Sequence, residues 1–240
     1  MEINNSDNAL TPWGITSFDS DFIGLPRLTF NLLRTCNYET SIAAIGHFLQ
    51  EGIDQDQRVA LVSFDHPVYL LNSFKEYGFS FDEELLSEKL IYLYYKPFFS
   101  HSLNFATNHQ KLFNEIKSLS NGDISRIAFR NADVLFNLET HLLAESSAER
   151  IMASFNDDHC AVLGCYQATD TQTDQHLDEV SQTYLSSYIE IKPAANSTGK
   201  TYELILRKSP IFHEKKSIEL CLSPNYGFSF PNRAKLVKHG

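Results

Sequence analysis

The run of residues 58–64 (RVALVSF) constrains the fold of this chain most, because its apolar residues follow one another without alternation. A strand with one solvated face alternates apolar and polar residues, whereas a strand buried on both faces is continuously apolar. Strands buried on both faces occur in parallel sheets that carry helices on each side. The run therefore predicts an internal strand of an α/β protein.

Strand-like and helix-like segments alternate through the first two thirds of the chain. Strands are expected at residues 27–33, 58–64, 90–95, 125–129 and 160–166. Helices are expected at residues 39–51, 67–77 and 103–119 and within 146–155, with Gly52 ending the first of them. This order predicts a mostly parallel sheet with right-handed crossovers.

The last third of the sequence has a different character, with strand-like segments joined by turn-rich pieces such as NSTGK and SPNYG. These segments are residues 184–192, 200–207, 217–222 and 226–230. They predict antiparallel hairpins added to the end of the sheet. We expect one domain over residues 13–232, with a polar tail at 1–12 and a basic tail at 233–240.

Composition narrows the class of partner. The chain has 240 residues, 42% of them hydrophobic and 21% charged, which is typical of a soluble globular protein. Its net charge of -10 repels a phosphate backbone, so no nucleic-acid partner is expected. The one local exception would be the basic end that contains Arg233, Lys235 and Lys238.

We expect neither an export signal nor a membrane-spanning segment. Its first ten residues lack the basic start and apolar core of a secretory signal, and no run approaches about 18 apolar residues. The four cysteines have spacings that suit a reducing compartment better than a disulfide framework. We expect a cytoplasmic protein that reaches the inner membrane, if at all, only as a peripheral member of a complex.

Residues 13–19 (WGITSFD) are similar to the GIxxLD segment that opens KaiC-like members of the RecA ATPase superfamily. From this segment onward the order of elements resembles that family. The resemblance implies a RecA-like three-layer domain with a nucleotide-binding loop after its first strand. It also implies a pair of catalytic acids after the second strand and an acidic Walker B residue later in the chain.

The nucleotide loop itself is degenerate. A P-loop reads GxxxxGK[ST], in which backbone N–H groups surround the phosphates and the hydroxyl holds magnesium. The corresponding segment here is LRTCNYET, residues 33–40. If Thr40 takes the hydroxyl position, then Leu33, Tyr38 and Glu39 replace the two glycines and the lysine. Bulk and negative charge in that position disfavour a polyphosphate, so a rigid or partly helical connector is expected.

The remaining ATPase positions are altered as well. Where the resemblance implies a Walker B aspartate, the chain has Arg130 and Asn131, and a guanidinium cannot ligate magnesium. Asp65 occupies the former catalytic-acid position, followed by His66. The pair Arg207-Lys208 lies near the family's late basic motif, although two basic residues after a strand are a common pattern.

Two further groups allow a chemical interpretation. Asp65 and His66 could form a base and its orienting partner, but a carboxylate at this position more often caps the next helix. His159, Cys160 and Cys165 could bind zinc. In a strand, however, residues five apart point to opposite faces, so Cys160 and Cys165 could not bind the same ion without a bulge. A packing role for the two thiols is therefore favoured over a zinc site.

An aromatic cluster at Tyr92, Tyr94, Tyr95, Phe98 and Phe99 is compatible with a docking or base-stacking surface. A buried strand followed by a packed turn is the favoured interpretation, because α/β cores contain many aromatic residues.

We therefore expect a pseudo-ATPase with no catalysis, no cofactor and no metal, acting as a scaffolding or adaptor subunit through protein partners. A homodimer or hetero-complex is expected, for example in a bacterial secretion, pilus or exopolysaccharide machine, which is an analogy at the level of the fold. The alternative is an atypical NTPase or a regulator that binds a nucleotide or cyclic dinucleotide. A transcriptional or clock-like regulator that acts through proteins is a third possibility.

Overall fold

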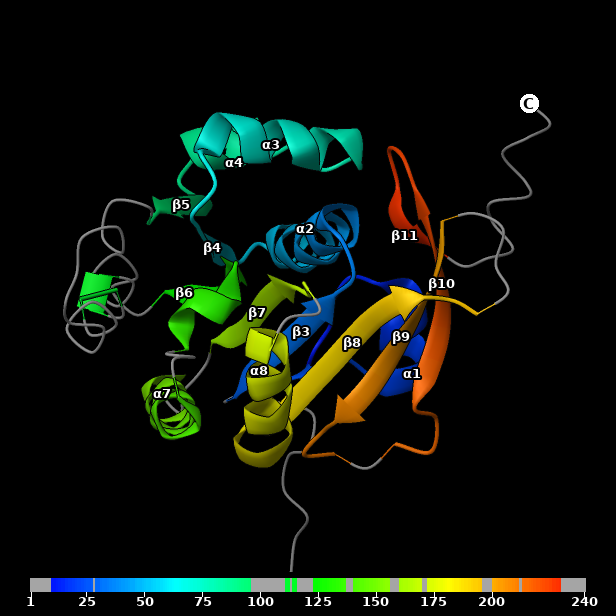
Figure 1. Ribbon diagram of the computed structural model, residues 1–240. Helices are drawn as coiled ribbons and strands as arrows, with labels where there is room; N and C mark the ends of the chain where they lie inside the picture. Colours follow the sequence, from blue (N-terminus) through cyan, green and yellow to red (C-terminus); the bar gives the residue numbers. More distant parts are fainter. Residues whose placement is uncertain are drawn as a thin grey trace, which may run out of the picture.

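A computed structural model describes residues 10–27, 29–95, 111–112, 114–115, 123–136, 140–155, 160–169, 172–195, 200–211 and 213–229. Its main element is a nine-stranded sheet with helices on both faces (Figure 1). This arrangement confirms the expected three-layer α/β class, with a largely parallel sheet and antiparallel strands at the C-terminal end.

The strands of the main sheet are β3 (Phe30–Thr35), β4 (Arg58–Ser63), β5 (Leu90–Tyr94), β6 (Ile124–Arg130), β7 (Ala161–Gln167), β8 (Ser187–Pro193), β9 (Thr201–Lys208), β10 (Ser217–Ser223) and β11 (Gly227–Ser229). A separate small sheet pairs β1 (Leu10–Thr11) with β2 (Leu25–Pro26). The helices are α1 (Thr16–Phe22), α2 (Tyr38–Asp54), α3 (Pro67–Glu76), α4 (Asp82–Leu86), the 3-10 helix η2 (Ala132–Leu135), α7 (His141–Phe155) and α8 (Gln172–Tyr184).

The strand order is β11-β10-β9-β8-β3-β7-β6-β4-β5. Strands β8, β3, β7, β6, β4 and β5 are parallel, and β9, β10 and β11 continue the sheet in antiparallel fashion. After β3 the chain continues to β4, which is separated from β3 in the sheet by β7 and β6. Strand β8 lies on the other side of β3. The carboxyl ends of strands at such a switch point form the usual ligand crevice of open α/β sheets.

One prediction for the last third is wrong. Strand β8 runs parallel to β3, with Leu33 opposite Ile189, rather than opening a purely antiparallel set. The reason is α8, a crossover helix that the sequence pattern did not reveal and that carries the chain back before β8 begins. The later hairpins, β9 to β11, are antiparallel as expected.

The two faces of the sheet carry separate cores. Helices α1, α2 and α3 cover one face, and α7 and α8 cover the other (Figure 1). In β4, Val59 and Leu61 contribute to the first core, whereas Ala60 and Val62 contribute to the second. Strand β4 is therefore buried on both faces, as its continuous apolar run predicts, and each large buried aliphatic side chain contributes about 1.5–3 kcal/mol.

Gly52 does not end the helix as predicted, because α2 continues to Asp54. A Cβ atom at Gly52 would lie 2.6 Å from the Cδ atom of Arg126 and 2.7 Å from a Val59 methyl group. The glycine is therefore required for the close approach of α2 to strands β4 and β6, and it gives no stop signal.

The motif that carries the family resemblance has a structural role here. The carboxylate of Asp19 accepts hydrogen bonds from the backbone nitrogens of Trp13 (2.7 Å) and Gly14 (2.8 Å). The indole nitrogen of Trp13 donates to the carbonyl of Ala44 in α2 (2.9 Å). These contacts fix the N-terminal segment on the first core, with Trp13 fully buried.

Several expected segments lie outside the described residues. They include most of the expected helix at 103–119, the residues from 230 onward and the first nine residues.

Candidate functional site at the carboxyl edge of the sheet

The segment aligned with the nucleotide loop is a tight turn between a strand and a helix. Strand β3 ends at Thr35 and α2 begins at Tyr38, with only Cys36 and Asn37 between them. The side-chain oxygen of Asn37 caps the helix by accepting a hydrogen bond from the Thr40 nitrogen (2.9 Å). The connector expected at residues 33–40 is thus a strand end, a short turn and the first helical turn.

Leu33, at the first glycine position, and Thr40, at the hydroxyl position, are both fully buried. Leu33 belongs to the core beneath α2. The Thr40 hydroxyl donates to the backbone carbonyl of Asn37 (3.0 Å) and lies 3.9 Å from the Cys36 sulfur. The hydroxyl that would hold magnesium in a P-loop is therefore engaged within its own turn.

Tyr38 stands at the position that aligns with the second glycine of a P-loop. The centre of the Arg130 guanidinium is 4.9 Å from the centroid of the Tyr38 ring, within the range of a cation–π contact. The Tyr38 hydroxyl donates to the Ser73 hydroxyl on α3 (3.1 Å). Tyr38 therefore connects the start of α2 to α3 above the guanidinium.

Arg130 is the last residue of β6, and only 4% of its side chain is exposed. Its Nε atom lies 3.6 Å from Oδ2 of Asp65, and both of these atoms are buried. Asn131 follows in the left-handed conformation (φ 66°) and turns the chain into η2. A buried guanidinium loses its hydration, so the nearby carboxylate and aromatic face are needed to offset that cost.

The capping role expected for Asp65 is wrong. Helix α3 begins after His66, whose side chain makes no capping hydrogen bond. The Asp65 backbone nitrogen donates to the Ser63 hydroxyl (3.0 Å), and Oδ2 of the Asp65 carboxylate lies 3.6 Å from Nε of Arg130. The local sequence favours a helix cap, but the carboxylate of Asp65 pairs instead with Arg130, which is distant in the sequence.

The structure thus brings together Tyr38 and Arg130, two positions that depart from the ATPase pattern, and Asp65, which stands at the implied catalytic-acid position. We call these three side chains the plug. They come from α2 and from the ends of β4 and β6, at the carboxyl edge where a ligand crevice is expected. Chemically the plug is a guanidinium, that of Arg130, with the Tyr38 ring and the Asp65 carboxylate each beside it. Sequence reasoning singled out each of the three positions but did not predict that Arg130 lies beside both Tyr38 and Asp65.

Glu39 lies at the surface beside the plug. Its carboxylate accepts a hydrogen bond from Lys200 (2.8 Å), and both side chains are at least 40% exposed. This hydrogen bond raises the pKa of Lys200. An exposed pair of this kind contributes about 0–1 kcal/mol to stability, so Glu39 links α2 to the start of β9 only weakly.

Arg207 and Lys208 do not point toward the plug. Arg207 Nε donates to Glu190 on β8 (2.8 Å), and Lys208 Nζ donates to the carbonyl of Gln182 near the end of α8 (2.8 Å). Lys208 is registered with Tyr188, near the amino end of β8 and thus away from the carboxyl edge.

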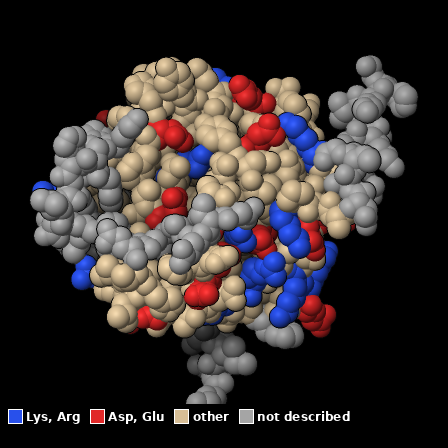
Figure 2. Space-filling view, viewed as in Figure 1, with Lys and Arg blue, Asp and Glu red and all other residues tan. Residues whose placement is uncertain are grey.

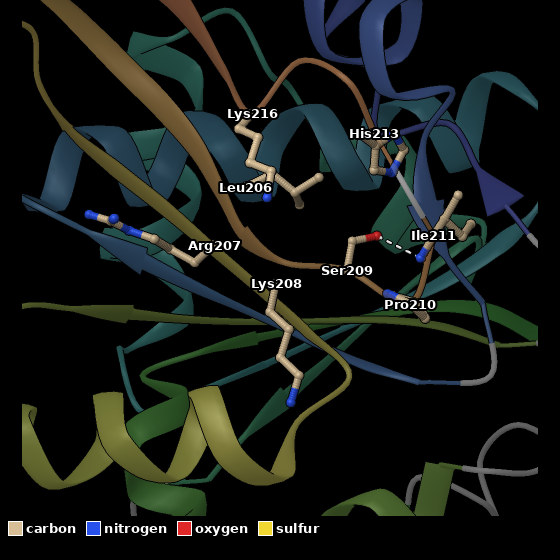
Figure 3. Close-up of a pocket in the computed structure, with 8 residues that line it drawn as sticks. All are labelled: Leu206, Arg207, Lys208, Ser209, Pro210, Ile211, His213 and Lys216. Atoms are coloured by element: carbon tan, nitrogen blue, oxygen red, sulfur yellow. Dashed lines mark hydrogen bonds between the residues drawn. The ribbon is translucent and has the colours of Figure 1, made fainter.

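Both basic residues line a pocket of about 300 Å³ at the β9–β10 turn, together with Ser209 and Lys216. Figure 3 shows that Arg207, Lys208 and Lys216 point in different directions, so their charges do not converge on one point. The late basic position therefore forms no focused anion site in this arrangement.

Arg34, inside the loop-aligned segment, points to the opposite face of the sheet. Its Nη1 atom lies 3.2 Å from carboxylate oxygens of both Asp178 on α8 and Glu190 on β8. Asp178 also accepts hydrogen bonds from the hydroxyls of Tyr166 (2.8 Å) and Tyr188. This network ties β3, β7, β8 and α8 together, and no short motif in the sequence indicates it.

The cysteines occupy opposite faces, as predicted. Cys165 is buried in the core under α2, whereas Cys160 packs against the α7–α8 core. Burial raises the pKa of both thiols, in the case of Cys160 to about 12. His159 lies outside the described residues. Within the described ranges, no group of three or more histidine, cysteine or acidic side chains is placed to hold a metal ion.

The aromatic cluster divides into a buried and a partly exposed part. Tyr95 is 1% exposed, and the Tyr92 hydroxyl donates to the Asp65 carbonyl (2.7 Å), whereas Tyr94 is half-buried beside His66. Phe98 and Phe99 lie outside the described residues. The favoured interpretation as a packed strand end therefore holds for Tyr92 and Tyr95.

Comparison with known proteins adds no family to this geometry: no protein-family model matches the chain, and no curated protein is significantly similar to it. Among the helices of the described ranges, none has the length and hydropathy needed to cross a bilayer.

Proposed function

We propose that this protein is a catalytically inactive, RecA-like adaptor or scaffolding subunit that acts through protein–protein contacts. The observation that carries the proposal is the plug: Arg130 lies over Tyr38 and beside Asp65 in the place where a nucleotide site would open. The resemblance to KaiC-like proteins and the position of β3 in the strand order support the choice of this edge as the former site.

The energetics of the plug favour a closed edge. A triphosphate would have to displace Tyr38 and draw Arg130 away from Asp65. Breaking a fully buried ion pair costs about 3–5 kcal/mol. Because the Asp65 side chain is 32% exposed, the cost here is about 2 kcal/mol. Any phosphate contact would first have to offset that cost, and no lysine or glycine of a P-loop is present to do so.

A closed edge is suited to holding a fixed surface toward a partner. The Arg130–Asp65 pair joins the ends of β6 and β4, and the Arg130–Tyr38 contact joins β6 to α2. The exposed Glu39–Lys200 pair adds only a weak link from α2 to the start of β9. We propose a cytoplasmic role in a homodimer or hetero-complex. A membrane-associated machine for secretion, pili or exopolysaccharide export is the setting that fold-level analogy favours.

Isothermal titration calorimetry with Mg-ATP, Mg-GTP and a cyclic dinucleotide tests the proposal directly. We expect no binding with any of the three. A dissociation constant below about 100 µM, equivalent to about -5.5 kcal/mol, would overturn it in favour of a nucleotide-binding regulator.

A second measurement tests the scaffolding role. The chain is purified from its native cell at native abundance under mild cross-linking, and its assembly mass is determined. We expect a defined complex heavier than the monomer. A monomer without stoichiometric partners would contradict a scaffolding function even if no nucleotide binds.

A further inference from the structure

A pocket of about 290 Å³ lies beside the last turns of α2, at the opposite end of this helix from Tyr38 of the plug. Its other walls come from the residues that follow α3 and from the turn between β10 and β11, which includes Asn225. Helix α2 spans 17 residues, about 25 Å. The pocket is therefore separate from the plug.

The α2 wall of the pocket carries the carboxylates of Glu51 and Asp54, and the described residues that line it include no lysine or arginine. Glu51 accepts a hydrogen bond from the Gln55 amide (2.8 Å) and Asp54 from the Gln50 amide (2.8 Å), so neither bond neutralises a charge. The guanidinium of Arg126 attracts Glu51, but it is fully buried and does not line the pocket. The α2 wall is therefore negatively charged.

The other walls add no positive charge. Nε2 of His47 accepts a hydrogen bond from the backbone nitrogen of Phe228 (2.8 Å), so this ring nitrogen carries no proton. Burial lowers the pKa of His47 to about 4, which keeps the ring neutral at neutral pH. Tyr226, which also lines the pocket, is 66% exposed, and the face of a tyrosine ring attracts cations. The pocket therefore suits a lysine or arginine side chain.

The basic side chains on the neighbouring strands are already engaged. Figure 2 shows lysine and arginine side chains over β8 and β9, at the lower right of the view, interleaved with acidic ones. On these strands, Lys192 lies 3.4 Å from Glu203, and Arg207 donates to Glu190 (2.8 Å). A cation for the pocket must therefore come from another part of the chain or from another molecule.

The segment that follows β11 contains basic residues to which the plug gives no role. Residues 230–240 have no acidic residue and three basic ones, Arg233, Lys235 and Lys238. The segment follows Ser229, the last residue of β11, and the preceding Phe228 is bonded to His47 in the pocket wall. Arg233 is five residues beyond Phe228, a reach of up to about 17 Å. The segment therefore begins beside the pocket.

We propose that this pocket binds a basic side chain of residues 233–238 of the same chain, against the carboxylates of Glu51 and Asp54. Exposed ion pairs are individually weak, so a free cation would gain little from the pocket. A segment attached at Ser229 differs, because the attachment gives it an effective concentration of about a millimolar. The chain's own segment is therefore favoured over a free ligand. The inference goes beyond the proposed function, which depends on the plug.

Carbodiimide cross-linking of the full chain tests the contact, because this reagent joins a lysine directly to a carboxylate without a spacer. We expect links from Lys235 or Lys238 to Glu51 or Asp54, identified by mass spectrometry. Raised salt should lower their yield at least fivefold, because it screens exposed charges. A mixture of isotopically light and heavy chains distinguishes links within one copy from links between two copies.

Amide resonances of the pocket wall give a second measurement. The segment variant Arg233→Gln/Lys235→Gln/Lys238→Gln should shift the amide resonances of Gly78 and Asn225, which line the pocket.

The same segment variant should cause no shift when it is made in the background of Glu51→Gln/Asp54→Asn, because the acidic wall is then absent. In the control background Glu88→Gln it should still cause the shift. Glu88 is an acid with an 83% exposed side chain between α4 and β5. These side chains are partly or largely exposed, so the variants should fold, which circular dichroism checks.

Links from Lys235 and Lys238 to Glu88 as often as to Glu51 and Asp54 would overturn the inference, because they would show no preference for the pocket. Resonances that the segment variant leaves unmoved, or moves equally in both backgrounds, would overturn it as well. Links found only between light and heavy chains would make a second copy the occupant and would also overturn it.

Discussion

The guanidinium of Arg130 lies 4.9 Å from the ring centroid of Tyr38, and its Nε atom lies 3.6 Å from Asp65. The resemblance to KaiC-like proteins implies a loop glycine at Tyr38, an acidic Walker B residue near Arg130 and a catalytic acid at Asp65. The Tyr38 ring and the Asp65 carboxylate both lie beside the buried guanidinium and partly offset the cost of its burial. Arg130 therefore links the ends of β4 and β6 to the start of α2 at this edge of the sheet.

Arg130→Met tests this interdependence, because it keeps much of the bulk over Tyr38 and removes the charge. Asp65 then loses its cation. A fully buried pair would cost about 3–5 kcal/mol when broken. Since the Asp65 side chain is 32% exposed, we expect a loss of about 2 kcal/mol in the free energy of unfolding. Urea denaturation measures this loss.

The double variant Asp65→Asn/Arg130→Met is the control, because it removes both charges. It should be more stable than the sum of the single effects predicts, with a coupling of at least about 1 kcal/mol. Effects that add within about 0.5 kcal/mol would show that the two residues do not stabilise each other.

Restoring the loop residues should not restore an ATPase. In Tyr38→Gly/Glu39→Lys the backbone can approach a phosphate and the lysine is present, but Arg130 and Asn131 still provide no acid for magnesium. We expect no phosphate release above that of the unaltered chain in a coupled assay at millimolar Mg-ATP. Measurable turnover in this variant would refute the argument that two separate lesions inactivate the site.

Stability between pH 4 and 6 should reflect two opposing groups near Gly14. Burial raises the pKa of Asp19 to about 6, so the folded form keeps a proton that the unfolded form has lost, and stability falls as pH rises. Burial lowers the pKa of His47 to about 4, so the folded form lacks a proton that the unfolded form binds, and stability rises with pH. The two slopes nearly cancel.

Removing either group should expose the other slope. His47→Gln should lose stability between pH 4 and 6, by up to about 3 kcal/mol, because one pKa unit corresponds to about 1.4 kcal/mol. Asp19→Asn should gain stability over the same interval, by a similar amount. Thermal unfolding at half-unit pH steps measures both profiles. Parallel profiles for the original chain and both variants would contradict the assignment.

The sequence predicted the parts of the fold that depend on local patterns. Continuous apolar runs located β4 and β7, and the strand–helix alternation gave the parallel core. Helix α8 was missed because its sequence, QTDQHLDEVSQTY, is largely polar and has few buried residues, among them Leu177 and Val180. Because helix α8 was not predicted, the parallel direction of β8 was not predicted either.

The candidate site was predictable as a set of positions but not as an arrangement. Local rules assign Asp65 to a helix cap, and nothing near it in the sequence indicates Arg130 as its partner. That contact follows from β4 and β6 lying side by side in the sheet. The same limit applies to Arg34, whose partners Asp178 and Glu190 lie far along the chain. Charge pairs that depend on strand order cannot be derived from spacing alone.

Gly52→Ala should destabilise the protein even though alanine is the better helix former by about 1 kcal/mol. The new Cβ would lie 2.6 Å from Arg126 Cδ and 2.7 Å from the Val59 Cγ1 atom, so α2 would have to move away from β4 and β6. Overpacking of this kind typically costs about 1–3 kcal/mol. Gln50→Ala, on the same helix, is the control and should change the unfolding free energy by less than about 0.5 kcal/mol. If Gly52→Ala proved as stable as the unaltered chain in urea denaturation, the glycine would have no packing role and its interpretation as a simple helix signal would have to be reconsidered.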